Sequence, residues 1–314
     1  MSATPPTETP PSNTSGSAGN TGSPLPASGA DWELDYYSRP ILEPDGKKRW
    51  ELLICSTPDP QGSQPPFRWV RRCPATIVNS IWLRTALQEA LQEAEAQGLA
   101  PPRRVRCWRA SMRSMVQRAL EGLGLELVPS RRCYALVEWL QERQDSVYPG
   151  EEGYLAGPLA PPPLPIQPVA VPLPEAARGE SWSWATLPAG ALAEASGWDT
   201  DFAGLVPLPT GLDPEAPVPG LRLFSRHRSL ALAAWLAGLE PVRLEISGDQ
   251  LVLEAGLEDR WLLGRLPQEE AQAAAAAFAA ARERACALQF LAVQSSEAEA
   301  RFQGFWMLRA LPDP

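Results

Sequence analysis

The apolar positions in the first half of the chain follow two periods, alternation in short runs and i, i+3, i+4 spacing in longer ones. Trp32–Tyr37 and Arg49–Cys55 alternate like strands and flank Pro44-Asp45-Gly46, which has turn chemistry. Ile77–Ala96 has the spacing of an amphipathic helix that ends before Gly98. Beyond it, the pattern predicts strands at Val105–Trp108 and Leu125–Val128 and helices over Met112–Leu123 and Leu136–Arg143.

The second half has a more regular order of elements. The pattern predicts a helix, a hairpin with a third strand, a long Ala-rich helix and two final strands: Leu230–Leu239, Val242–Ile246, Leu251–Glu254, Trp261–Leu266, Pro267–Ala285, Leu288–Val293 and Phe305–Leu311. This α-β-β-β-α-β order resembles the core of restriction-endonuclease-like folds, which is an analogy of fold and not of activity.

A proline-rich stretch separates the two halves. Eight prolines fall within residues 157–174, and such a stretch favours extended polyproline II over a helix or a central strand. We therefore predict a mixed α/β protein with a disordered tail at 1–30, an N-terminal domain at 31–155, a proline-rich linker at 156–180 and a C-terminal domain at 181–314. The alternative for the proline-rich stretch is a ligand for an aromatic groove on another protein.

Two short motifs occur in both halves. Ser130-Arg131-Arg132 stands before Ala135-Leu136-x-x-Trp139-Leu140, as Ser225-Arg226-His227-Arg228 stands before Ala231-Leu232-x-x-Trp235-Leu236. Arg49-Trp50-Glu51-Leu52-Leu53 is similar to Arg260-Trp261-Leu262-Leu263. Because the order of the two motifs is swapped between the halves, a permuted internal duplication is one hypothesis, and chance similarity of amphipathic helices is the other.

Cysteine usage and the absence of a leader pattern bear on the compartment. The five cysteines are widely spaced and form no C-x-x-C, which favours reduced thiols. No apolar run has the roughly 18 residues of a membrane span. The first 30 residues contain no Lys or Arg, unlike transit peptides and secretory signals. We therefore expect a cytoplasmic protein without a membrane span.

The charge is unevenly distributed. The whole chain has a net charge of −9, which by itself argues against nucleic-acid binding. Residues 31–143, however, hold 17 Lys and Arg against 14 Asp and Glu, while the rest of the chain holds 11 against 23. Binding to a polyanion should therefore be local and sensitive to salt. The alternative is that the arginines merely form a solvated helix surface.

Catalytic patterns are weak. The single histidine, His227, stands between arginines and has no Ser or Cys motif of a nucleophile around it. No P-loop and no clustered Cys and His for zinc occur. Glu33, Asp35 and Glu51 are placed to converge on adjacent strands as a Mg²⁺ site, but Leu53 stands where such a nuclease needs its Lys. We expect a protein that is not an enzyme and has no metal or cofactor, with a nuclease relic as an alternative.

Basic residues interleaved with aromatic ones form the most informative pattern. Single-stranded RNA is held in this way, because cations contact phosphates while aromatic rings and guanidinium planes stack on bases. The candidate RNA-binding residues are Tyr37, Arg39, Lys47, Lys48, Arg49, Arg104, Arg106, Trp108, Arg109, Arg113, Arg131, Arg132, Arg226 and Arg228. A protein-docking surface uses the same residue types, so the pattern leaves both interpretations open.

Several long motifs resemble those of a known family. They are WELDYYSRPILEPDGKKRWELLICS (Trp32–Ser56), RCWRASM (Arg106–Met112), VPSRRCYALVEWL (Val128–Leu140), SLALAAWLAGLEP (Ser229–Pro241), LEAGLEDRWLL (Leu253–Leu263) and GFWMLR (Gly304–Arg309). Together they resemble the TAB-type translational activators of chloroplasts and cyanobacteria. The last motif has Met307 where we expect Leu, a change that conserves volume.

The resemblance implies an RNA-binding protein that supports translation of the messenger for the PsaB subunit of photosystem I, and photosystem biogenesis more widely. It implies RNA as the partner, with other biogenesis proteins as further partners. Plant members of the family would be stromal, whereas this chain is expected to be a cyanobacterial relative. The rival interpretation is an assembly adaptor that contacts photosystem subunits and does not bind RNA directly.

Overall fold

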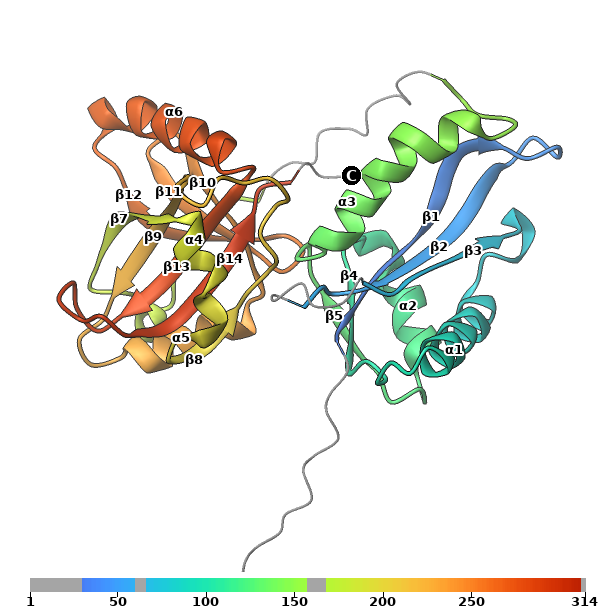
Figure 1. Ribbon diagram of the computed structural model, residues 1–314, viewed down its shortest axis with the longest axis horizontal. Helices are drawn as coiled ribbons and strands as arrows, with labels where there is room; N and C mark the ends of the chain where they lie inside the picture. The colour runs from blue at the N-terminus through green and yellow to red at the C-terminus, as the bar shows by residue number, and fades with distance from the viewer. Residues whose placement is uncertain (1–29, 60–65, 157–167, 312–314) are drawn as a thin grey trace, which may run out of the picture.

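The computed structural model describes residues 30–59, 66–156 and 168–311. These residues form two lobes, an N-terminal half built on one sheet and a C-terminal half built on two (Figure 1). The predicted mixed α/β class is confirmed, since helices and mixed sheets alternate along the chain. Among the described residues, no helix combines the length and the apolar character that crossing a membrane requires.

The sheet of the N-terminal half has the order β3-β2-β1-β4-β5. Strands β1 (Trp32–Leu42), β2 (Lys48–Ser56) and β3 (Arg68–Cys73) form an antiparallel meander, and β4 (Arg104–Cys107) and β5 (Glu126–Pro129) add to β1 in parallel. β3 is an addition to the prediction, because the apolar pattern indicated no element between Cys55 and Ile77. Arg68 and Arg72 are exposed on one face of this edge strand and Arg71 is half-buried on the other, so charged side chains on both faces hide the apolar alternation of a strand.

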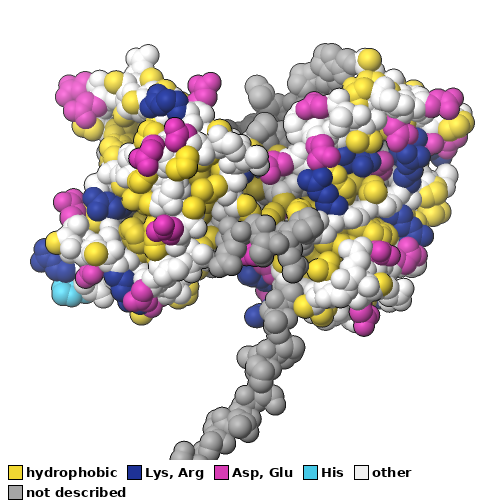
Figure 2. Space-filling view, in the orientation of Figure 1, with side chains coloured by type: hydrophobic (Ala, Val, Ile, Leu, Met, Phe, Trp, Pro, Cys, Tyr) yellow, Lys and Arg dark blue, Asp and Glu magenta, His cyan; other side chains and the backbone are white. Residues whose placement is uncertain are grey.

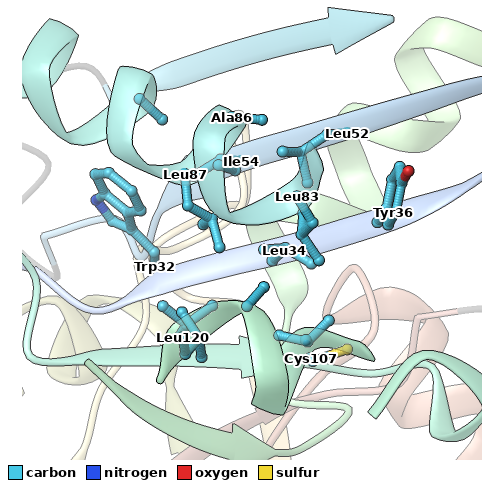
Figure 3. Close-up of a cluster of buried hydrophobic side chains, with 14 of the residues drawn as sticks. Trp32, Leu34, Tyr36, Leu52, Ile54, Leu83, Ala86, Leu87, Cys107 and Leu120 are labelled. Atoms are coloured by element: carbon cyan, nitrogen blue, oxygen red, sulfur yellow. The ribbon is translucent and has the colours of Figure 1, made fainter. Parts of the chain in front are cut away.

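Two helices cover one face of this sheet. α1 (Ser80–Ala96) begins at Asn79, whose side chain accepts the backbone N–H groups of Ile81 and Trp82, and α2 (Arg113–Leu120) lies beside it. Alternate residues of β1 point into this layer because successive side chains of a strand face opposite ways. Figure 3 shows Leu34 among the apolar side chains of the helices.

On the other face of the sheet, α3 (Tyr134–Glu142) packs on β1 and β2. Glu33 of β1 faces α3, where its carboxylate accepts the Leu136 N–H. Arg106 of β4 is the register partner of Glu33 and so points to the same face, where it contacts Glu240 of the C-terminal half. The C-terminal half therefore covers part of this face beside α3.

The C-terminal half contains a four-stranded sheet, β10-β11-β12-β6, and a five-stranded sheet, β7-β9-β13-β14-β8. Its elements are β6 (Val171–Pro172), β7 (Ser181–Pro188), α4 (Ala189–Ala193), β8 (Thr200–Gly204), β9 (Pro217–Phe224), α5 (Ser229–Gly238), β10 (Pro241–Ser247), β11 (Gln250–Ala255), β12 (Asp259–Arg265), α6 (Gln268–Arg284), β13 (Leu288–Gln294) and β14 (Phe302–Arg309). The elements predicted from 230 onward are confirmed, whereas the strands and the short helix between 181 and 224 were missed.

Two finer expectations about the C-terminal half gain no support. The α-β-β-β-α-β order exists from α5 to β13, but β13 lies in a different sheet from β10, β11 and β12, so the restriction-endonuclease-like core is not confirmed. The halves also differ in strand order, with five strands in one sheet against nine in two, which does not favour a permuted duplication.

Part of the predicted linker belongs to the C-terminal half. β6 pairs in parallel with β12, and Leu173 and Ala177 are buried. Residues 157–167 of the linker and 1–29 of the predicted tail lie outside the described residues. The five cysteines are all free thiols, as the sequence predicted, and four of them are buried.

Candidate nucleic-acid interface

A stack of three side chains forms the most accessible aromatic feature among the candidate residues. The guanidinium carbon of Arg109 lies 3.9 Å from the ring centre of Tyr37 and 3.8 Å from that of Trp108. Tyr37 is 36% exposed, while Arg109 and Trp108 are partly buried. Trp108 and Arg109 directly follow β4, so the stack stands at the carboxyl end of the parallel strands, where α/β sheets commonly bind ligands.

A buried ion-pair network holds the Arg109 side chain of the stack. Asp35 accepts from the Nε of Arg109 and pairs with Arg39, whose Nη1 lies 2.7 Å from it. Burial alone raises the pKa of Asp35, but Arg39 and Arg109 outweigh it and hold the pKa below its ordinary value. Glu51 joins the network through Arg39 and also accepts from Arg143 and Tyr148. These contacts hold Arg109 in one position, so the two rings are presented in a fixed arrangement.

Three further candidates add accessible positive charge to the N-terminal half. Arg113 is the first residue of α2, four residues after Arg109. Lys47 lies in the turn between β1 and β2, and Lys48 is the first residue of β2. All three are exposed, and within the described ranges Arg113 and Lys48 have no ion-pair partner. Lys47 has a weak contact with Asp45 at 3.9 Å. Figure 2 shows that Lys and Arg side chains of the N-terminal half are interspersed with acidic ones, so accessible positive charge is local.

Two candidates are buried against carboxylates of their own half, which corrects the expectation that they are surface contacts. Arg39 is 4% exposed between Asp35 and Glu51. Arg49 is 7% exposed and pairs with Glu43 and Glu151. Both guanidinium groups neutralise carboxylates of the same half, so a phosphate reaches neither without displacing an internal partner.

The other four candidate arginines of this half bind carboxylates or backbone carbonyls. Three of the four bind groups that belong to the C-terminal half. Arg104 pairs with Asp31 in its own half. Arg106 donates two hydrogen bonds to Glu240, at 2.7 and 3.1 Å. Arg131 donates to Glu254 at 2.7 Å. Arg132 donates to the Gly204 carbonyl at 2.7 Å and to the Pro241 carbonyl at 2.9 Å. Arg131 and Arg132, which were predicted to bind RNA before the start of α3, therefore form a contact between the halves in this structure.

The two candidates of the C-terminal half lie apart from the stack. Arg226 and Arg228 are exposed in the loop between β9 and α5. The Nη1 of Arg228 donates to the Glu175 carbonyl, and the backbone N–H of Arg226 donates to Glu180. His227 is exposed between them. The structure brings together the stack and its neighbours on one half, and leaves this basic loop on the other.

A cleft of about 820 Å³ lies between the halves. Its walls come from α3, from the segment 203–210 and from the start of β1, and Arg106, Arg132 and Arg309 line it. Glu33 lies at its buried side and has a pKa of about 7, because burial disfavours its charge more than Leu136, Arg106 and Thr57 favour it. The cleft therefore combines three arginines with a carboxyl group that titrates near neutral pH.

Tyr134, which the sequence analysis did not single out, anchors this contact. It begins α3 in the N-terminal half, yet its ring is buried in an apolar cluster of the C-terminal half with Phe290 and Met307. Its hydroxyl donates to the Val242 carbonyl at 2.6 Å. The only sequence signal was an aromatic residue shortly after the Arg pair, at the start of a helix.

The carboxylates considered for a Mg²⁺ site all have other partners. Glu33 accepts from Leu136 and Thr57, Asp35 pairs with Arg39 and Arg109, and Glu51 accepts from Arg143 and Tyr148. Among the described residues no group of three His, Cys, Asp or Glu side chains is placed to hold a metal ion. The geometry therefore gives no support to the nuclease alternative.

The fold and this surface define an α/β protein that presents arginine and aromatic side chains on its N-terminal half. Family profiles agree with that description. One described as "RNA-binding protein Tab2/Atab2 N terminal" matches residues 31–143, and one described as "RNA-binding protein Tab2/Atab2, C-terminal domain" matches residues 161–309. The chain belongs to the Tab2/Atab2 family of RNA-binding proteins.

Two plant proteins are similar over most of their length. The chloroplastic TAB2 homologue of Zea mays is 35% identical over 304 residues, covering 92% of this chain and 74% of its own. That of Arabidopsis thaliana is 33% identical over 294 residues, covering 90% and 75%. A cryoEM structure of the simian T-cell lymphotropic virus intasome with PP2A regulatory subunit B56 gamma has a TM-score of 0.23 at 10% identity, covering 76% of this chain and 82% of its own, which is too low to show a shared fold.

Proposed function

We propose that this chain is an RNA-binding regulatory protein that holds single-stranded RNA at the Tyr37–Arg109–Trp108 stack. The observation that carries the proposal is the position of Arg109 between two aromatic rings, with the ring of Tyr37 exposed beside it. A base stacks on an exposed aromatic face whatever its identity, and each such contact contributes about 1–3 kcal/mol. Arg113, Lys47 and Lys48 supply cations for the phosphates on either side.

We further propose that RNA binding supports translation of the messenger for a photosystem subunit, PsaB being the first candidate. Membership of the Tab2/Atab2 family and similarity to two chloroplastic relatives support this role. Crosslinking in the native host followed by sequencing of the bound RNA tests it. Enrichment of the PsaB messenger is expected, and recovery of unrelated RNA only would contradict this assignment.

A filter-binding titration tests the stack itself. We compare wild-type protein with Tyr37→Ala and Tyr37→Phe, using a labelled single-stranded oligonucleotide at low salt. Loss of the ring should weaken binding about ten-fold, while Phe retains the stacking face and should preserve affinity. Tyr37→Ala also removes the ring contacts of Tyr37 with Arg109 and Trp50, whereas Tyr37→Phe retains them and so serves as the structural control.

The same titration separates RNA binding from the adaptor interpretation. Saturable binding that weakens steeply with salt is the expected result for wild-type protein. If the folded protein shows no saturable binding at low salt, the RNA proposal fails and a protein adaptor is favoured. If binding occurs but both Tyr37 variants match wild type, RNA binding stands and the stack is excluded as its site.

A further inference from the structure

The contact between the halves brings basic side chains of one half against acidic side chains of the other. Arg106 and Arg131 of the N-terminal half pair with Glu240 and Glu254 of the C-terminal half. Arg132 donates to two backbone carbonyls of that half. All three guanidinium groups therefore contact oxygen atoms of the other half, and that of Arg106 also pairs with Asp31 of its own half at 3.0 Å.

These oxygen atoms have the chemistry of a phosphate ligand. Glu240 accepts a bidentate pair of hydrogen bonds from Arg106. Guanidinium groups bind carboxylates and phosphates with this same geometry. Glu240 also has a positive φ of 56°, a left-handed conformation that costs a non-glycine residue free energy. Glu240 therefore pairs with Arg106 from a backbone conformation that is unfavourable for a residue other than glycine.

We propose that Arg106, Arg131 and Arg132 form a second phosphate-binding site for single-stranded RNA, which Glu240 and Glu254 occupy while the halves are in contact. This inference rests on the proposed RNA-binding function. RNA phosphates replace the two carboxylates, so binding requires a local opening of this part of the contact. Tyr134, buried in the C-terminal half, keeps the halves joined while the ion pairs exchange.

The cleft gives RNA a route to this surface. Arg106 and Arg132 line the cleft of about 820 Å³, so two of the three arginines border a space that is already open. The exchange replaces one set of charge-assisted hydrogen bonds with another and leaves the arginines paired before and after it. Contacts between domains that depend on polar groups commonly permit relative movement.

The double variant Glu240→Gln/Glu254→Gln tests the inference. Gln keeps the size of Glu but removes the charge that competes with phosphate. We expect the Kd of a labelled oligouridine to fall roughly ten-fold, as for a typical coupling between two sites. The dependence of log affinity on log salt should also steepen, by about 0.7 for each added phosphate contact on a single strand.

Two control variants separate this effect from simpler ones. Glu283→Gln/Glu297→Gln removes the same charge from exposed positions and should leave the Kd within about two-fold, because surface substitutions away from a site have small effects. Adding Arg106→Ala and Arg131→Ala to the test variant should abolish the gain.

A measurement on wild-type protein keeps the test valid if a variant unfolds. The Arg131 N–H donates to the Gly256 carbonyl at 2.8 Å across the contact, so saturating oligouridine should speed hydrogen exchange at Arg131. Unchanged exchange at saturation, an unchanged Kd in the folded test variant, or an equal gain in Glu283→Gln/Glu297→Gln would each overturn the inference. If instead the test variant binds more tightly while Tyr37→Ala matches wild type, this site stands and the stack proposal fails.

Discussion

Glu33 and Arg106 are register partners on the parallel strands β1 and β4, yet their side chains reach different elements. Glu33 accepts the Leu136 N–H in the first turn of α3 at 2.9 Å, and Arg106 reaches Glu240 in the C-terminal half. Glu33 therefore holds α3, and Arg106 holds the C-terminal half, on the same face of the sheet. Each of these contacts has a measurable consequence.

Glu33→Gln should change how stability depends on pH. The pKa of Glu33 rises in the folded state from 4.5 to about 7, so the folded protein keeps a proton that the unfolded chain has lost. Stability from this group is therefore complete below pH 4.5, decreases as pH rises from 4.5 to 7, and stays low above that. The loss amounts to roughly 3 kcal/mol.

The amide introduced by Glu33→Gln would keep the hydrogen bonds of this position, since its carbonyl accepts from Leu136 and its N–H donates to the Thr57 hydroxyl. The variant should therefore be more stable than wild type at about pH 8 and lose this advantage at about pH 4. Urea unfolding at both pH values measures the difference. An identical pH dependence for both proteins would contradict the assigned pKa.

Arg39→Ala should strongly destabilise the N-terminal half. Arg39 is buried between Asp35 and Glu51, and its removal leaves both carboxylates with fewer compensating charges. Breaking a buried ion pair from one side costs about 3–5 kcal/mol. Urea unfolding should show this loss, whereas Lys48→Ala at the exposed start of β2 should stay within about 0.5 kcal/mol of wild type. Similar midpoints for the two variants would show that Arg39 is not structurally important.

Gly204→Ala should loosen the contact between the halves. A Cβ at this position would lie 2.5 Å from Cδ1 of Trp306 and 3.1 Å from Nη2 of Arg132, so the buried indole or the arginine must move. Such overpacking costs about 1–3 kcal/mol. Gly197→Ala is the matched control, because a Cβ there meets no atom of the described structure within 4 Å. Thermal unfolding compares them, and equal midpoints would refute the steric argument.

Arg113→Ala should reduce the salt dependence of RNA binding without affecting stability. Arg113 is exposed at the start of α2. Each phosphate contact on single-stranded nucleic acid contributes about 0.7 to the slope of log affinity against log salt concentration. Arg284→Ala, also exposed but at the end of α6 in the other half, should leave the slope unchanged. Filter binding at several salt concentrations measures both. Equal slopes for the two variants would place Arg113 outside the RNA-binding surface.

Local patterns predicted most of the secondary structure because periodicity and capping act within a few residues. β1, β2, α1 and the order from α5 to β14 follow the apolar spacing closely. β3 and the strands between 181 and 224 were missed. β3 carries three arginines on an edge, and residues 181–224 are interrupted by many Pro and Gly, so neither shows a clear alternation.

The sequence by itself determined the family, the mixed α/β class and the unusual pairing of arginine with aromatic residues. Only the tertiary structure decided which arginines are accessible. Arg106 meets Glu240, a residue 134 positions away, whereas Arg113 faces solvent, although both lie in the same Arg-rich stretch. A guanidinium group binds carboxylate and phosphate with the same geometry, so its role depends on what the fold places opposite it.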